Sequence, residues 1–268
     1  MSGVCEIRLE AASFSLPGGR DYNEDFLGEG EATGALRLFV LADGAGGHGG
    51  GDVASRTAVQ AAVATFRELQ AFSADTVRRC IGQAHQAVID LQKTQPRLAR
   101  MASTLVLVLI NCKAGQALLG NLGDSRCYVF RGKGVTAQSQ DHSLVQRFID
   151  AGLFPAERLR EHPKRNVLYA SLGANEEEVE PHVSEQPISL QAGDGMLLCS
   201  DGVWELLQDS ELGELHAGSD TVGEWRDRLL AALQAGMPMG HDNYSAYVIR
   251  CVTALSGGSA GDEQAPQG

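Results

Sequence analysis

"FVLADGAGGHGGGDVAS", residues 39–55, begins as an apolar run, ends that run at one acidic residue, Asp43, and continues as a loop made mostly of glycine. The short apolar run that stops at Asp-Gly is typical of a buried strand. The loop is open to three interpretations: a phosphate-binding loop, a flexible linker, or a turn that gives Asp43 a special position. The loop lacks the Lys-Ser/Thr pair of a P-loop and the spacing of a dinucleotide fingerprint, which argues against the first.

Similar apolar runs recur along the chain, and each is short and bounded by Gly, Asn or Asp. They predict buried strands at 36–42, 104–110, 117–122, 127–130, 196–199 and 245–252. Apolar residues at helical spacing predict helices at 52–70, 75–93 and 221–234, with Asp75 as the cap of the second helix. This order of elements predicts an α+β protein built mainly on antiparallel sheet.

Composition narrows the class of protein further. The chain has 268 residues, 43% of them hydrophobic, and a formal net charge of −12, which does not suit a nucleic-acid-binding protein. Six cysteines are scattered without a C-x-x-C pair, so we expect reduced cysteines and a cytoplasmic location. We expect no membrane insertion, because no apolar stretch approaches the length of a membrane span. The polar tail, 256–268, is expected to be disordered.

Acidic residues follow or precede the predicted strands in one repeated pattern. Asp43, Asp124 and Asp201 each follow an apolar run, and Asp242 precedes one. A single Asp-Gly is most simply a turn. Several carboxylates at the ends of buried strands need a stronger explanation, because a buried charge must be paired or bound. Converging carboxylates without nearby Cys or His predict a site for Mg²⁺ or Mn²⁺.

This pattern is carried by seven motifs, which occur in the order RDYNED (20–25), LADGAGGHGGGDVAS (41–55), ASTLVLVLI (102–110), GNLGDSRCYVFR (120–131), QDHS (140–143), LCSDGVWELL (198–207) and DNYS (242–245). In this order the motifs resemble those of the metal-dependent Ser/Thr protein phosphatases of the 2C type, and most closely the bacterial branch with its D-G-x-G-G-H loop. The resemblance spans about residues 5–252.

The resemblance implies an α-β-β-α sandwich, in which two antiparallel sheets are flanked by helix pairs. It implies a catalytic domain over 1–255 with a small flap subdomain at about 144–168. It also implies two Mn²⁺ or Mg²⁺ ions and a third, weaker one. The implied ligands are Asp43 as the bridge, the Gly44 carbonyl, Asp201, Asp242, Glu24 directly or through water, Asp25 through water, and Asp124 for the third ion.

The resemblance further implies the reaction. Asp43, Asp201 and Asp242 hold the ions, a hydroxide bridging two of them attacks phosphorus in line without a phosphoenzyme, and Arg20 binds the phosphate. The substrates are then phosphoserine and phosphothreonine in proteins, supplied by a cognate Ser/Thr kinase, and we expect a monomer. Two alternatives stay open: a catalytically weak pseudophosphatase that acts as a regulatory binding module, and a two-metal hydrolase with a different phosphate substrate.

This chain departs from the family pattern at informative positions. Ala45 stands where animal-type members carry a histidine, so the general acid is open between His48 and a metal-bound water. Glu205 replaces an aspartate that contributes to the third ion, which predicts an altered or weak third site. Asn243 is expected to position the Asp242 loop.

Three further residues are expected to be structural. Arg126 is predicted to anchor the G-D-S-R turn through a salt bridge, and Trp204 to pack in the core. His142 is predicted to organise the base of the flap.

Overall fold

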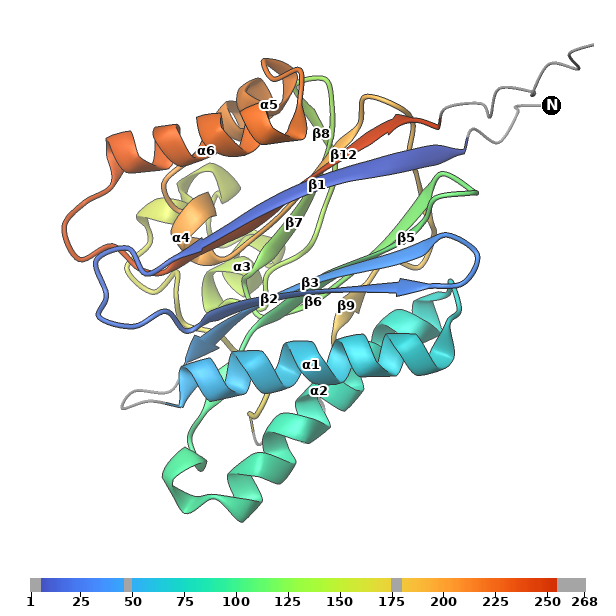
Figure 1. The fold of residues 1–268 in the computed structure, drawn as a ribbon. Coiled ribbons are helices and arrows are strands. Elements are labelled where there is room, and N and C mark those ends of the chain that lie inside the picture. The colour runs from blue at the N-terminus through green and yellow to red at the C-terminus, as the bar shows by residue number, and fades with distance from the viewer. Residues whose placement is uncertain (1–5, 46–49, 175–179, 255–268) are drawn as a thin grey trace, which may run out of the picture.

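Two antiparallel sheets are stacked face to face, and helices cover both outer faces (Figure 1). The computed structural model describes residues 6–45, 50–174 and 180–254. This arrangement is the α+β sandwich that the sequence predicts, with one helix pair against each sheet.

The strands predicted from apolar runs all form, and they lie inside the sheets. The first sheet has the order β1 (Ile7–Leu16), β12 (Tyr244–Thr253), β11 (Gly195–Cys199), β7 (Arg126–Arg131) and β8 (Gly134–Gln138). The second has the order β10 (Ile188–Ser189), β6 (Gln116–Leu122), β5 (Leu105–Asn111), β3 (Leu36–Ala45) and β2 (Asp25–Ala32), with β4 (Ala102–Ser103) on β3 and β9 (His182–Val183) on β6.

Helices α1 (Gly51–Leu69) and α2 (Ala74–Thr94) cover the second sheet, and α2 is followed by a short 3-10 helix, η1 (Pro96–Leu98). Helices α5 (Asp209–Ala217) and α6 (Val222–Gly236) lie over the first sheet, and the short α4 (Asp201–Trp204) follows β11 directly. Among the described residues, no helix combines the length and the apolar composition that a membrane crossing needs.

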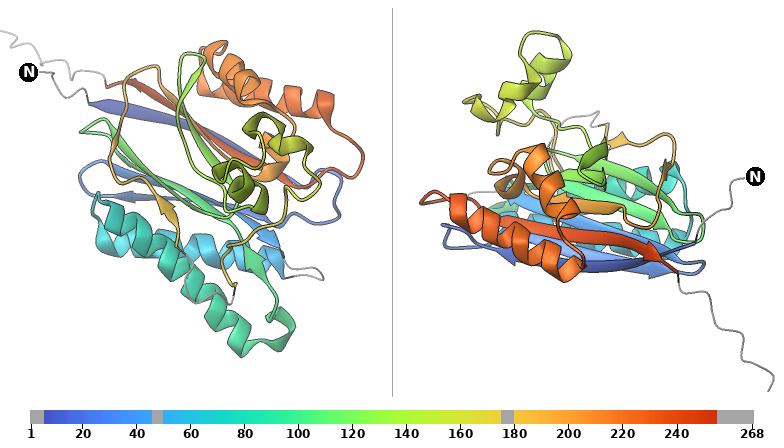
Figure 2. Two further views of the ribbon diagram at one scale, coloured as in Figure 1. Left: turned by 180° about the vertical axis from the view of Figure 1, so that it is seen from behind. Right: turned by 90° about the horizontal axis from the view of Figure 1, so that it is seen from above.

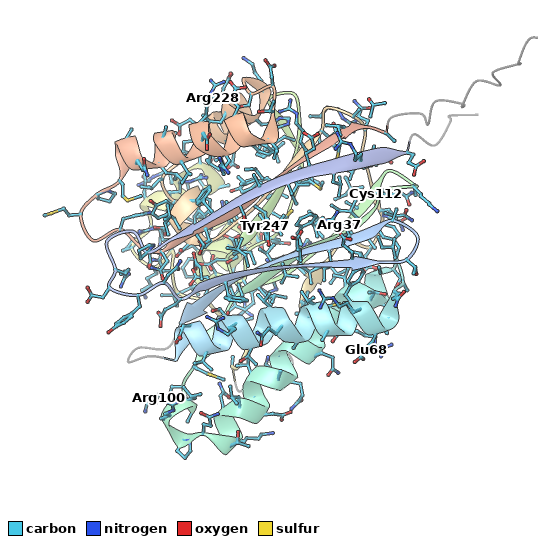
Figure 3. The ribbon with its side chains drawn as sticks, viewed as in Figure 1. Arg37, Glu68, Arg100, Cys112, Arg228 and Tyr247 are labelled. Carbon is cyan, nitrogen blue, oxygen red and sulfur yellow. The ribbon has the colours of Figure 1, made fainter. Side chains whose placement is uncertain are left out.

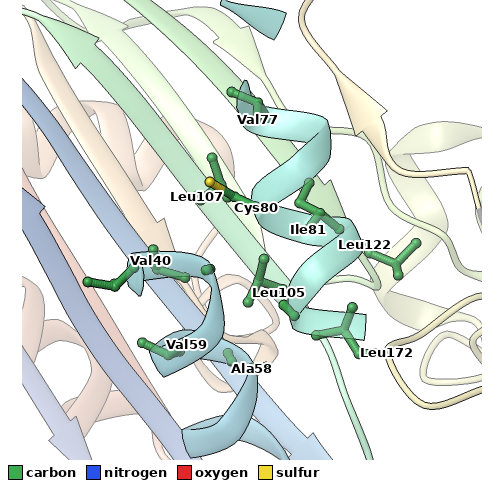
Figure 4. Packing of buried hydrophobic residues seen from close by; sticks show 14 of the residues in the cluster. Val40, Ala58, Val59, Val77, Cys80, Ile81, Leu105, Leu107, Leu122 and Leu172 are labelled. Atoms are coloured by element: carbon green, nitrogen blue, oxygen red, sulfur yellow. The ribbon is translucent and has the colours of Figure 1, made fainter. Parts of the chain in front are cut away.

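Three apolar layers hold these elements together. The first lies between α1, α2 and the second sheet, where Val59, Ile81 and Leu107 pack (Figure 4). The second lies between the sheets, where Tyr247 meets Phe39 with ring centroids 5.3 Å apart (Figure 3). The third lies between the first sheet and α4, α5 and α6. Burial on both faces explains why the central strands are continuous apolar runs.

The predicted cap of α2 is wrong by two residues. Ser73 is the N-cap, and its hydroxyl accepts a hydrogen bond from the backbone N–H of Thr76 at 3.1 Å. Asp75 lies in the first turn instead, where a negative charge favours the helix dipole. Serine fits the cap because its short side chain reaches the free N–H groups of the first turn.

The segment between β8 and β9 contains the predicted flap. It holds α3 (Leu144–Asp150) and a 3-10 helix, η2 (Ala156–Glu161), which stand out from the sandwich in yellow-green in the right-hand view of Figure 2. Arg160 of η2 ties the segment to the core, because its Nε donates to the carbonyl of Trp204 at 2.7 Å. The predicted disordered tail, 256–268, lies outside the described residues.

Candidate active site

The predicted acidic residues gather at one end of the sandwich, and both sheets contribute to the cluster. Asp43 lies in β3 directly opposite Asp25 of β2. Asp201 is the first residue of α4, immediately after β11, and Asp242 lies two residues before β12. Asp124 lies between β6, which is a strand of the second sheet, and β7, which is a strand of the first. The neighbouring charges of Asp25, Asp201, Asp124 and Asp242 all act on Asp43.

Hydroxyl groups from the neighbouring strands fix the backbone of Asp43. Its N–H donates to Thr104 Oγ1 at 3.0 Å, and its carbonyl accepts from Ser103 Oγ at 2.9 Å. The Thr104 hydroxyl in turn lies 2.7 Å from Ser125 Oγ. The end of β3 is therefore tied to the turn that carries Asp124.

Ser200 joins the two sheets at the cluster. Its hydroxyl donates to Asp25 Oδ2 at 2.8 Å and accepts from the backbone N–H of Ser245 at 3.1 Å. Asp25 belongs to the second sheet, whereas Ser245 belongs to the first. This contact therefore fixes the separation of the acidic residues on the two sheets.

Asn243 ties the Arg20 loop to the Asp242 loop. Its Oδ1 accepts from the backbone N–H of Glu24 at 2.8 Å, and its Nδ2 donates to the carbonyls of Pro17 at 2.9 Å and Tyr22 at 2.8 Å. Buried side-chain amides that satisfy three backbone groups hold loops in one arrangement. Asn243 thus sets the place of the whole 17–24 loop.

Arg20 lies at the rim of the cluster. Its Nη2 donates to Asp242 Oδ2 at 2.8 Å, and 56% of its side-chain surface is exposed. A planar guanidinium with exposed N–H groups is suited to bind phosphate oxygens. The rim therefore presents positive charge beside a negative centre.

The cluster is unfavourably charged without a positive partner. Burial and the neighbouring carboxylates raise the pKa of Asp43 and Asp201 well above the usual range. Burial also raises the pKa of Asp25 to about 6 and that of Asp124 to about 7. Among the described residues, Oδ1 of Asp25 and Oδ1 of Asp201 are buried without a hydrogen-bond partner. Buried oxygens in this state fit a divalent cation.

The backbone at Gly44 is packed so closely that no side chain fits. A Cβ at this position would lie 2.0 Å from the carbonyl oxygen of Gly51 and 2.8 Å from that of Glu24. The Gly44 carbonyl itself lies near Gly51, against which the Glu24 carboxylate also packs. The close approach brings a backbone carbonyl and a carboxylate to the same edge of the cluster, and burial raises the pKa of Glu24.

The side chains do not converge fully in this arrangement. Among the described residues, no three acidic, His or Cys side chains meet as the ligands of a single ion. Asp242 is directed to Arg20 instead. A cation site of the predicted composition therefore requires the Asp242 side chain to turn.

The two remaining predicted residues have different outcomes. Glu205 follows the last residue of α4, and both of its carboxylate oxygens accept hydrogen bonds from Arg165 of the flap segment. His48 lies outside the described residues. Arg165 could not be predicted from the sequence, because no local pattern connects residue 165 to residue 205. Ser200 was not predicted either, although its position beside Asp201 is a usable signal.

The structural roles predicted from the sequence are confirmed. Arg126 forms a bidentate pair with Asp141, with N–O distances of 2.9 and 2.7 Å, and lies 3.7 Å from the ring centroid of Trp204. Trp204 is buried, and its Nε1 donates to the carbonyl of Asp124 at 2.9 Å. His142 is buried at the base of the flap segment, where its Nδ1 accepts from the N–H of Gly123 at 3.3 Å.

Comparisons with known proteins identify relatives of this chain. The family model described as "Protein phosphatase 2C" matches residues 20–235. The Serine/threonine phosphatase stp of Listeria monocytogenes is 30% identical over 235 residues, which cover 86% of this chain and 90% of that protein.

Solved structures give the same result. The Ser/Thr phosphatase PstP/Ppp of Mycobacterium tuberculosis superposes with a TM-score of 0.77 at 30% identity, covering 92% of this chain and 100% of that one. The catalytic domain of PstP in complex with two manganese ions gives a TM-score of 0.74 at 29% identity, covering 92% and 99%. The chain therefore belongs to the protein phosphatase 2C family of metal-dependent Ser/Thr protein phosphatases, as its sequence motifs predict.

Proposed function

We propose that this chain hydrolyses phosphoserine and phosphothreonine in proteins by direct attack of water on phosphorus, without a phosphoenzyme. The observation that carries the proposal is the acidic cluster of Asp25 and Asp124, which are buried, and Asp43 and Asp201, which are half-buried, with Arg20 at its rim. With Asp242, five neighbouring carboxylates repel one another, and bound cations would offset this repulsion. The exposed guanidinium of Arg20 beside them is suited to bind a phosphate group.

The residues present fit two divalent cations. Asp43, the Gly44 carbonyl, Asp201 and Asp242 would hold them, with Glu24 and Asp25 at their edge. Bound cations of this kind supply an activated water and screen the charge of the phosphoryl group. The donors are all oxygens, which favours Mn²⁺ or Mg²⁺ over zinc.

The chain's own residues then do the following. With cations bound, Asp242 would turn away from Arg20 to join their ligands, which would free the guanidinium. Arg20 binds two phosphate oxygens through its planar fork and holds the phosphorus in line for attack. Asn243 keeps the Arg20 loop at a fixed distance from Asp242 while this exchange takes place.

The substrates are proposed to be proteins phosphorylated by a Ser/Thr kinase of the same cell. The relatives named above are called Ser/Thr phosphatases, which supports this substrate class. The flap segment at about 144–168 lies outside the sandwich and is the proposed place of substrate selection.

The test is Mn²⁺-dependent hydrolysis of p-nitrophenyl phosphate and of a phosphothreonine peptide. We expect activity with Mn²⁺, its loss in EDTA, and a decrease on the order of 10²–10³-fold for Asp201→Asn, because a cation ligand supports several kcal/mol of transition-state stabilisation. Asp75→Asn, an equal change of charge at the exposed start of α2, should leave the rate unchanged.

The result also separates the alternatives. A wild-type chain that binds Mn²⁺ but is inert on both substrates would contradict the proposal and favour a regulatory binding module. Activity on p-nitrophenyl phosphate alone would favour a hydrolase of small phosphate esters.

A further inference from the structure

Arg165 of the flap segment forms a close ion pair with Glu205 beside the acidic cluster. Its Nε donates to Glu205 Oε1 at 2.6 Å and its Nη2 to Oε2 at 3.0 Å. The Glu205 side chain is 15% exposed and that of Arg165 33% exposed. Bidentate pairs of this geometry are stronger and more directional than a single contact.

Glu205 belongs electrostatically to the acidic cluster. Its charge acts on both Asp124 and Asp201, and these two also act on each other. We call these three interacting carboxylates, Asp124, Asp201 and Glu205, the acidic pole of the cluster. Glu205 is the member that contacts the flap segment. Hydrogen bonds to Glu205 and the charges of Glu205 and Asp201 raise the pKa of Arg165, so the guanidinium interacts with two members of the pole.

A second arginine of the flap segment, Arg160, has different partners from those of Arg165. Arg160 donates to the carbonyls of Trp204 and Leu207 and to Asp209 Oδ1, at 2.7, 3.2 and 2.8 Å. It anchors the same flap segment to the same part of the core. Its bonds go to the end of α4 and to α5, and Glu205 is not among its partners.

We propose that Arg165 is the built-in counter-ion of the Asp124–Asp201–Glu205 pole and stands in place of a third cation. The inference rests on the proposed function, which supplies the two cations at Asp43. In this chain the pole is then neutralised by a flap residue, and the enzyme works with two bound ions.

The physical reason is competition for Glu205 and for the space beside it. Both oxygens of Glu205 are occupied by Arg165, so a cation would have to break a bidentate pair or share the carboxylate with a fixed positive charge. Like charges held a few ångströms apart repel strongly at a partly buried site. A divalent ion therefore binds this pole at least about ten-fold more weakly with Arg165 present than without it.

The test counts bound Mn²⁺ in the 268-residue chain without substrate, through the decrease of the free Mn²⁺ signal in electron paramagnetic resonance. We expect two tight ions in wild type and one further ion in Arg165→Met, bound at least about ten-fold more tightly than any third ion of wild type. Arg158→Met makes the same change of charge in the same segment, at a side chain that is 62% exposed and pairs with Glu161, and should bind like wild type. Arg165→Lys keeps the charge and should also bind two ions.

A double variant, Arg165→Met with Glu205→Gln, should lose the added ion, since it removes the carboxylate that the arginine had covered. Retention of the two tight ions shows in each variant that the main site is folded. Equal stoichiometry and affinity in wild type and Arg165→Met would overturn the inference and leave the proposed function intact. A wild-type chain that binds no Mn²⁺ would overturn both.

Discussion

Two arginine–aspartate pairs lie near the acidic cluster, and they differ in burial and in the number of hydrogen bonds that join them. Arg126 and Asp141 are buried, with side chains 5% and 2% exposed, and make two hydrogen bonds. Arg20 and Asp242 are 56% and 42% exposed and make one.

The difference separates a pair that stabilises the fold from a pair that takes part in the proposed reaction. A buried bidentate pair is held on all sides and cannot exchange partners without unfolding its surroundings. An exposed single contact contributes little to stability and can be exchanged. Exchange is what the proposed reaction needs, since Arg20 must leave Asp242 when phosphate arrives.

The largest expected effect comes from breaking the buried pair. Arg126→Met leaves the Asp141 charge buried without its partner, so we expect the free energy of unfolding, measured with urea, to fall by about 3–5 kcal/mol. Replacing both residues, as Arg126→Met with Asp141→Leu, removes the orphaned charge and should recover most of that loss. A double variant as unstable as the single one would contradict the assignment of the pair as structural.

Removing the exposed arginine should lower activity and leave stability nearly unchanged. We expect Arg20→Ala to lower kcat/KM by about 10²–10³-fold, because a donor to the phosphoryl group is lost. The free energy of unfolding should change by less than about 1 kcal/mol. Arg20→Lys keeps the charge without the planar fork and should lie between the two. A large loss of stability in Arg20→Ala would remove the distinction between the two pairs.

The smallest effect concerns a buried histidine, His216, whose pKa is lowered by burial. His216 is buried against Trp225, its Nδ1 lies 2.8 Å from the Gly132 carbonyl, and burial lowers its pKa. The unfolded chain then binds a proton at a higher pH than the folded one. Stability is therefore complete above the unfolded pKa of about 6.5 and falls as the pH drops through it toward the folded pKa.

His216→Phe should reduce the pH slope of the unfolding free energy between pH 7.5 and 5 by up to one proton, about 1.4 kcal/mol per pH unit. Urea unfolding at several pH values measures this slope. An unchanged slope would show that the pKa of His216 is the same in the folded and the unfolded chain, which would contradict the prediction.

The interior of the fold could be predicted from sequence, and its edges could not. Every predicted strand lies inside a sheet, where both faces are buried and the sequence becomes a continuous apolar run. Of the missed strands, β1, β2, β8 and β10 are the ends of the two sheet orders, and β4 and β9 are two-residue strands that pair with β3 and β6. Their sequences are mixed with polar residues or very short, since one side faces water or a loop, and an apolar pattern cannot mark them.

The site divides in the same way. Asp43, Asp124, Asp201 and Asp242 are marked by the strand ends beside them, so the sequence places them at one end of the sheets. The Arg165–Glu205 pair depends on how the flap segment packs on α4, across 40 residues, and no local pattern records such a contact. Similarly, the bonds of Asn243 to Pro17 and Tyr22 join segments more than 220 residues apart.

The register of β2 and β3, which sets Asp25 directly opposite Asp43, has a consequence for the life of the protein in a cell. Like charges facing each other across two strands destabilise the pair. On the proposed function, the bound ions remove this repulsion, and the folded chain gains stability with each ion it takes up. A chain without bound ions would then unfold, and be exposed to proteases, more often than a chain that holds them.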